Sequence, residues 1–131
     1  MDTTIEAPLT SSERLQNRVA GEMLFQEGED PAGVYVVHSG SVDLLFSPRT
    51  GAAKPLRVAS PGQILGLSAV VMQRPHDCSA TARDTCEIGF IPREEFLRVL
   101  AERPTVWFSV LRLLSRDVNA VYDDMRTLAV G

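Results

Sequence analysis

The sequence predicts a mainly β domain, an antiparallel jelly-roll β-barrel with a short N-terminal helix before it and a long C-terminal dimerisation helix after it. Three observations predict this class. Glycines recur through the first half of the chain and separate apolar or alternating runs of four to six residues, which is the rhythm of short antiparallel strands. Residues 92–128 instead repeat apolar side chains every three or four positions, which is helical spacing. The length of 131 residues fits one domain with one core.

The start of the chain divides into a leader and a helix. Residues 1–9 show no apolar periodicity and predict a flexible leader, so that residues 10–131 form a single domain. Thr10 followed by Glu13 matches a capping box, and apolar side chains then recur at helical spacing. We therefore expect a short helix over residues 10–20.

Residues 21–91 are expected to form the barrel. Six runs have strand-like composition and are bounded by turn residues such as Gly28 to Pro31 and Ser39-Gly40. A polar loop, residues 47–55, separates the third and fourth runs. The expected strands are Met23–Phe25, Val34–Val37, Val42–Phe46, Leu56–Ala59, Ser79–Arg83 and Cys86–Ile91.

The stretch from Gly62 to Thr81 interrupts this series of strands. It begins at a Pro61-Gly62 turn, reaches Gly66 through a short apolar run, and continues through small residues and an irregular polar segment to Ser79. A glycine followed by a short helical turn presents free backbone N–H groups, which attract anions. We expect this stretch to be a ligand cassette that the barrel holds in place.

Residues 92–131 are expected to form two C-terminal helices. The first begins with acidic residues after Pro92, carries Phe96, Val99 and Leu100 on one face, and ends before Pro104. The second begins at Pro104, where proline is tolerated at the first helical position, and meets no further glycine or proline before Gly131.

The last predicted helix carries an apolar seam with alternating steps of four and three residues. A second apolar stripe accompanies its first half only. We expect the first half to pack on the barrel and the second half to pair with the same helix of another copy, giving a homodimer; the alternative is a helix packed wholly on its own barrel. The seam consists of Trp107, Leu111, Leu114, Val118, Val121, Met125 and Leu128.

Composition excludes several classes of function. A net charge of −4 argues against direct nucleic acid contact, which needs a basic face. No apolar run approaches the roughly 20 residues of a membrane span, and the N-terminus lacks the features of a signal peptide, so we expect a cytoplasmic protein without a membrane segment. Two cysteines and two histidines, without an H-x-H pair, do not predict a metal site or a disulfide framework.

The order of elements resembles the cyclic nucleotide-binding domain, the sensor module of Crp/Fnr-type bacterial regulators, of protein kinase A regulatory subunits and of nucleotide-gated channels. The resemblance spans Val19 to Leu128. It implies a non-enzymatic module for signal transduction in transcription regulation, with cyclic AMP or cyclic GMP as ligand. Crp/Fnr-type regulators continue into a DNA-binding helix-turn-helix, whereas this sequence ends at Gly131, so we expect either a lone sensor or the sensor part of a longer protein. The residues that match the family pattern are Gly21, Gly28, the run Val34 to Val42, Pro61-Gly62, Gly66, Ala69 and Ser79-Ala80-Thr81.

The family's cassette reads approximately Phe-Gly-Glu-x-Ala-Leu, a short gap, then Arg-Ser/Ala-Ala-Thr. Its glutamate accepts from the ribose hydroxyl and its arginine pairs with the cyclic phosphate. In this sequence Leu67 stands at the glutamate position and Cys78 at the arginine position, and the gap is longer by one or two residues. By resemblance, the last helix also lies over the base. The ligand-binding residues that the resemblance implies are Gly66, Leu67, Ser68, Ala69, Cys78, Ser79, Ala80, Thr81, Asn119 and Tyr122.

The two replaced positions predict weak binding of cyclic AMP. A charge-assisted hydrogen bond contributes about 1.5–3 kcal/mol, so losing both contacts weakens binding by about a thousandfold or more. Arg74 or His76, in the longer gap, could supply a substitute cation; the alternative is that both face solvent on a loop tip. The pocket could instead hold an apolar ligand lined by Leu67, or be empty, leaving a degenerate ligand-free barrel that acts as a dimerisation or protein-interaction scaffold.

Two further readings of the cassette remain. Residues 66–70 loosely match the G-x-S-x-G nucleophile elbow, but the final glycine is absent and the predicted barrel offers no strand–turn–helix sheet, so we do not expect an enzyme. Cys78 could have a redox role, and the alternative is a buried, inert cysteine.

Overall fold

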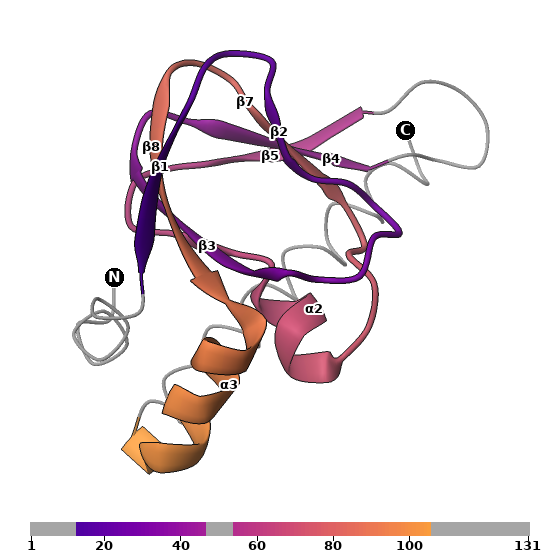
Figure 1. Cartoon of the computed structure of the whole chain (residues 1–131). Helices are drawn as coiled ribbons and strands as arrows, with labels where there is room; N and C mark the ends of the chain where they lie inside the picture. The colour runs from indigo at the N-terminus through magenta and orange to yellow at the C-terminus, as the bar shows by residue number, and fades with distance from the viewer. Residues whose placement is uncertain (1–12, 47–53, 106–131) are drawn as a thin grey trace.

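A computed structural model describes residues 13–46 and 54–105 of the chain. It consists mainly of antiparallel strands, with two helices at one end of the barrel (Figure 1). The predicted fold class is confirmed in this part of the chain. The elements are β1 (Arg14–Arg18), β2 (Met23–Phe25), β3 (Gly33–Ser39), β4 (Val42–Phe46), β5 (Lys54–Ala59), β6 (Ile64–Leu65), α2 (Leu67–Met72), β7 (Ser79–Ala82), β8 (Cys86–Pro92) and α3 (Arg93–Glu102).

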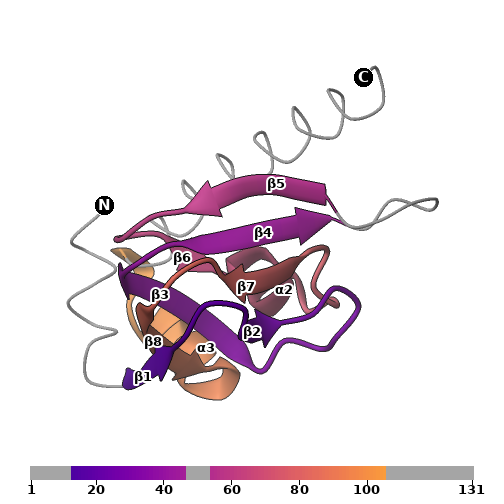
Figure 2. The ribbon, with the colours of Figure 1, turned by 90° about the horizontal axis from the view of Figure 1, so that it is seen from above.

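The strands form two four-stranded sheets. One has the order β1-β8-β3-β6 and the other the order β2-β7-β4-β5, and each pairing within them is antiparallel. Seen from above, β1 and β5 lie on opposite sides of the molecule (Figure 2). Consecutive strands therefore often belong to different sheets, as in a jelly roll.

Strand β3 divides the core into two clusters. Successive side chains of a strand point to opposite faces, so Val34 and Val36 face the helices while Tyr35 and Val37 face the barrel interior. The first cluster, between the barrel and the helices, comprises Val34, Val36, Ile64, Leu67, Val70, Ile91, Phe96 and Leu100. The second, between the two sheets, comprises Leu24, Phe25, Tyr35, Val37, Val42, Leu44, Ala59, Leu65, Ala80, Ala82, Cys86 and Ile88.

The helix predicted over residues 10–20 is wrong in its described part. Residues 14–18 form β1, which pairs with β8. Leu15 and Val19, which fall at helical spacing, are 65% and 58% exposed, so they pack against no core and favour no helix. Glu13, read as a capping residue, instead pairs with His38 on the outside of the barrel. Hydrogen bonding to β8 outweighs the weak local signal of a capping box.

The other predicted elements in the described residues are confirmed, with small changes in their bounds. Strand β6 was not predicted, because two residues are too short to show an alternating pattern. The leader over residues 1–9, the long C-terminal helix from residue 106 onward and its dimerisation seam lie outside the described residues. Among the described residues, none of the helices has the length and apolar character needed to cross a membrane.

Gly33 and Gly89 offer a matched test of the packing between β3 and β8. A Cβ at Gly33 would collide with the backbone carbonyl of Ile91, whereas a Cβ at Gly89 would meet the flexible carboxylate of Glu13. Backbone cannot move aside as a side chain can. We expect Gly33→Ala to lower the free energy of unfolding by about 2 kcal/mol or more. Gly89→Ala should cost less than about 1 kcal/mol, because it displaces only the Glu13–His38 pair. Urea denaturation of both variants would measure this, and equal losses would contradict it.

Candidate ligand-binding site

The cassette folds as the sequence predicts. Gly66 precedes α2 with a left-handed backbone (φ 80°), which glycine adopts without a steric cost, and α2 then runs from Leu67 to Met72. A Cβ at Gly66 would lie 3.2 Å from the carbonyl oxygen of Gly33 and 3.2 Å from Cε1 of His76. The first residue of the cassette turn is therefore held closely between β3 and the segment that follows α2.

Backbone hydrogen bonds of His76 connect the segment after α2 to the loop between β2 and β3. Its backbone N–H donates to the carbonyl of Glu29 at 2.9 Å, and its carbonyl accepts from the N–H of Gly28 at 2.8 Å. His76 is 4% exposed, and its ring stacks on Phe25 with ring centroids 3.9 Å apart. The alternative that His76 faces solvent is therefore wrong. Burial lowers the pKa of His76, opposed by the nearby charges of Asp77 and Glu29, so the neutral ring is favoured.

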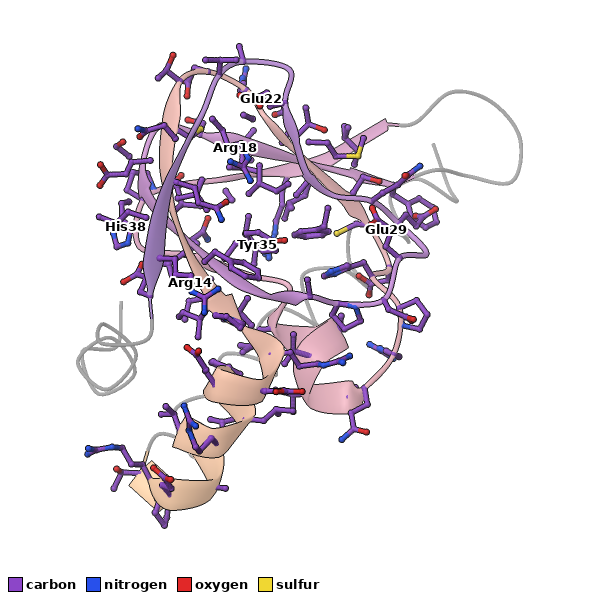
Figure 3. The ribbon with its side chains drawn as sticks, in the orientation of Figure 1. Arg14, Arg18, Glu22, Glu29, Tyr35 and His38 are labelled. Carbon is purple, nitrogen blue, oxygen red and sulfur yellow. The ribbon has the colours of Figure 1, made fainter. Side chains whose placement is uncertain are left out.

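The stacked pair continues as a row of rings across the barrel interior. Phe25 contacts Tyr35 with ring centroids 5.5 Å apart, and Tyr35 contacts Phe90 at 5.0 Å. Tyr35 lies inside the barrel, whereas His38 lies on its outside (Figure 3). Burial raises the pKa of Tyr35, an effect that Arg18 opposes and Glu29 reinforces. The row links the cassette to β2, β3 and β8, and it fills part of the space between the sheets.

The residues implied by the resemblance separate into two environments. Leu67 is 2% exposed and packs in the cluster beneath α2 and α3, beside Val34 and Phe96. Cys78 and Ala80 instead belong to the barrel interior. The structure therefore does not bring Leu67 and Cys78 into one cluster.

The remaining cassette residues pack or form hydrogen bonds locally. Ala69 is buried, and the Oγ atom of Ser68 accepts from Nη2 of Arg74 at 3.0 Å. The Oγ atom of Ser79 accepts from the backbone N–H of Glu27 at 2.8 Å. Thr81 pairs with Met23 and Asp43 on the neighbouring strands. Asn119 and Tyr122 lie outside the described residues.

Cys78 carries a neutral thiol at pH 7. Burial and the adjacent Asp77 raise its pKa to about 12, with Arg57 lowering the pKa and Glu27 raising it. A protonated thiol is a poor nucleophile, which favours the inert cysteine over a redox role. In the part of the chain that the structure describes, no group of three or more His, Cys, Asp or Glu side chains could hold a metal ion.

Sequence reasoning missed Arg57 of β5. It lies opposite Leu44 in the register of β4 and β5, and the next residue on the same face, Ala59, is buried in the barrel interior. The alternation of Arg57, Val58 and Ala59 is visible in the sequence. Only the sheet pairing shows which of the two faces is the inner one.

The fold resembles that of several solved structures. It matches a catabolite activator protein from Thermus thermophilus with a TM-score of 0.82 and 22% identity, over 98% of this chain and 60% of that one. It matches the regulatory domain of Toxoplasma gondii PKA, solved with cAMP, with a TM-score of 0.74 and 22% identity, over 91% of this chain and 43% of that one. At these identities the likeness shows the fold, a cyclic nucleotide-binding β-barrel.

The sequence comparisons define the family. Residues 15–103 match the family model of the cyclic nucleotide-binding domain, and the chain belongs to this family. It is 27% identical over 96 residues to a cyclic AMP receptor protein of Thermus thermophilus, covering 73% of this chain and 44% of that relative. It is 28% identical over 99 residues to the transcriptional activator protein Anr of Pseudomonas protegens, covering 76% of this chain and 40% of that relative. The chain thus spans less than half the length of these two relatives.

The buried ring of His76 predicts a dependence of stability on pH. Folding lowers the pKa of His76, so below the ordinary histidine pKa of about 6.5 the unfolded chain binds more protons than the folded chain. The free energy of unfolding therefore falls as the pH decreases from about 6.5 towards the pKa of the folded state. Urea denaturation between about pH 5 and pH 8 should show a shallower loss in His76→Phe than in the wild type. The control is His38→Gln, which replaces the histidine on the outside of the barrel. In this variant the contribution of His76 to the pH dependence of the free energy of unfolding should remain. Equal pH slopes in the wild type and His76→Phe would contradict the assignment.

Proposed function

We propose that this chain is a non-enzymatic regulatory module that senses a small ligand inside its barrel. The match of residues 15–103 to the cyclic nucleotide-binding domain carries the proposal, because this region contains both sheets and the cassette around α2. Ligand in the barrel would shift the population of cassette and helix arrangements, and a partner element would read out that shift. The Crp/Fnr-type relatives support a role in transcription regulation.

The ligand that we propose is a cyclic nucleotide, bound more weakly than by a cassette with the family's glutamate and arginine. Leu67 packs into the helix-side core, and the thiol of Cys78 is neutral, so neither supplies the expected polar contact. Solved relatives that share this fold include one in complex with cAMP. The barrel architecture supports the ligand class, and the two replaced side chains account for the reduced affinity.

A second candidate function is a ligand-free scaffold. The row of His76, Phe25, Tyr35 and Phe90 fills part of the space between the sheets, and this observation favours it. Under this alternative the barrel would serve dimerisation or protein interaction alone. The measurement of nucleotide binding below separates the two functions.

We also propose that the chain forms a homodimer through its last helix. The heptad spacing of Leu114, Val118, Val121, Met125 and Leu128 supports this, since such a seam pairs with a second helix of the same kind. A dimer would give the sensor a partner to which a change in the barrel could be transmitted.

Restoring the missing cation should strengthen nucleotide binding. A charge-assisted hydrogen bond contributes about 1.5–3 kcal/mol, so we expect Cys78→Arg to bind cyclic AMP at least about tenfold more tightly than the wild type. Isothermal titration calorimetry with cyclic AMP and cyclic GMP would measure the affinities, and Cys78→Ser is the uncharged control. If neither the wild type nor Cys78→Arg binds either nucleotide, the scaffold function is favoured.

The dimer proposal is tested by placing a charge in the seam. Val118→Glu would set two carboxylates against each other in an apolar interface, so we expect a monomer where the wild type is a dimer. Size-exclusion chromatography with light scattering would report the mass. Ala120→Glu, off the seam of the same helix, should leave the mass unchanged. A wild-type monomer, or a dimer that survives Val118→Glu, would refute the proposal.

A further inference from the structure

Arg57 lies on the interior face of the barrel wall. In the sheet β2-β7-β4-β5, Leu44 is paired with Arg57 on one side and with Ala80 on the other. Directly paired residues of neighbouring strands have their side chains on the same face. Leu44 and Ala80 are 5% and 0% exposed in the core between the sheets, so this face is the inner one. Arg57 is half-buried, whereas the next residue, Val58, is 38% exposed on the outer face.

The position occupied by Cys78 shares this inner face. Cys78 precedes Ala80 by two residues and packs against the same cluster. Arg57 is near enough to the thiol to lower its pKa by its positive charge, while Asp77 and Glu27 act in the opposite direction. Of these two acidic residues, Asp77 is exposed and Glu27 is half-buried. Arg57 therefore lies on the same inner face as the position where the sequence lacks an arginine.

On the inner face of this sheet, Leu44 lies between Arg57 and Ala80, and the neighbouring side chains on β7 are small. Ala80 and Ala82 present only methyl groups towards the interior, and both are buried. Two strand spacings, about 10 Å, separate the backbone of β5 from that of β7. The planar guanidinium forms paired hydrogen bonds to a phosphate, which makes arginine the preferred residue for recognising this group.

Arg74, a second cation near the cassette, is placed less well. It is exposed, and its Nη2 atom donates to Ser68 on α2. Charges in water are screened and contribute little, whereas a half-buried charge interacts more strongly with its partner. Because Arg57 is half-buried on the inner face and Arg74 is exposed, Arg57 is the better candidate to contact an anion inside the barrel.

We propose that Arg57 is the specificity-determining residue that contacts the phosphate of the ligand, taking over from the absent arginine at position 78. This rests on the proposed nucleotide-sensing function. It makes the ligand class an anionic cyclic phosphate, selected over the uncharged nucleoside of the same base. The cation comes from β5, on the opposite side of β4 from the cassette strand β7.

Titration calorimetry of the full chain with cyclic AMP and with adenosine tests the assignment. We expect Arg57→Gln to weaken cyclic AMP binding by about tenfold to a hundredfold and to leave adenosine binding unchanged, because only the phosphate contact is removed. Arg57→Lys, which keeps the charge without the paired hydrogen bonds, should give an intermediate loss and decides the matter if Arg57→Gln does not fold. Arg74→Gln, and Arg83→Gln in the turn before β8, are matched exposed controls and should change either affinity by less than about threefold.

The outcomes separate this inference from the function on which it rests. Unchanged cyclic AMP affinity in Arg57→Gln and Arg57→Lys, or a large loss in Arg74→Gln instead, overturns the role of Arg57 while the sensor function stands. Equal losses for cyclic AMP and adenosine also overturn it, since they indicate a structural role. A wild-type chain that binds neither probe overturns the nucleotide-sensing function and the inference together.

Discussion

The burial of β3 on both of its faces is the constraint on which this molecule depends. Each residue from Gly33 to Val37 is buried, because one face meets the helices and the other meets the barrel interior. Such a strand tolerates no charged side chain along this run and no shift of register, since a shift by one residue would exchange the two faces. Gly33 lies so close to β8 that even a methyl group would meet backbone. The helices and the barrel are thereby fixed to a common strand.

The same strand connects the cassette to the rest of the barrel. Gly66 lies against Gly33 on one side and His76 on the other, and His76 stacks on Phe25 of β2. Tyr35, on the barrel face of β3, continues the row of rings to β8. A displacement of the cassette would thus disturb contacts with three strands at once. This packing is a physical route by which ligand occupancy in a barrel of this family could alter its outer elements.

The two positions that depart from the family pattern have different physical consequences. Leu67 contributes to the helix-side core, so an apolar residue at this position stabilises the packing of α2 and α3. Cys78 packs against the barrel interior, where its thiol is neutral and the positive charge of Arg57 acts on it. Similarity to a family motif identifies both positions but does not show that they face different cores.

The sequence by itself determined the glycine-bounded strands, the helical turn after Gly66 and helix α3, because turn residues and local periodicity act over a few neighbouring positions. Only the tertiary structure decided that residues 14–18 form a strand, that the ring of His76 is buried and that Arg57 faces inward. Each of these depends on a partner distant in the chain: β8 for β1, Phe25 for His76, and β4 for Arg57. Pairing between distant segments leaves little trace in local composition, so the pattern that predicted the barrel could not predict that Arg57 lies on its inner wall.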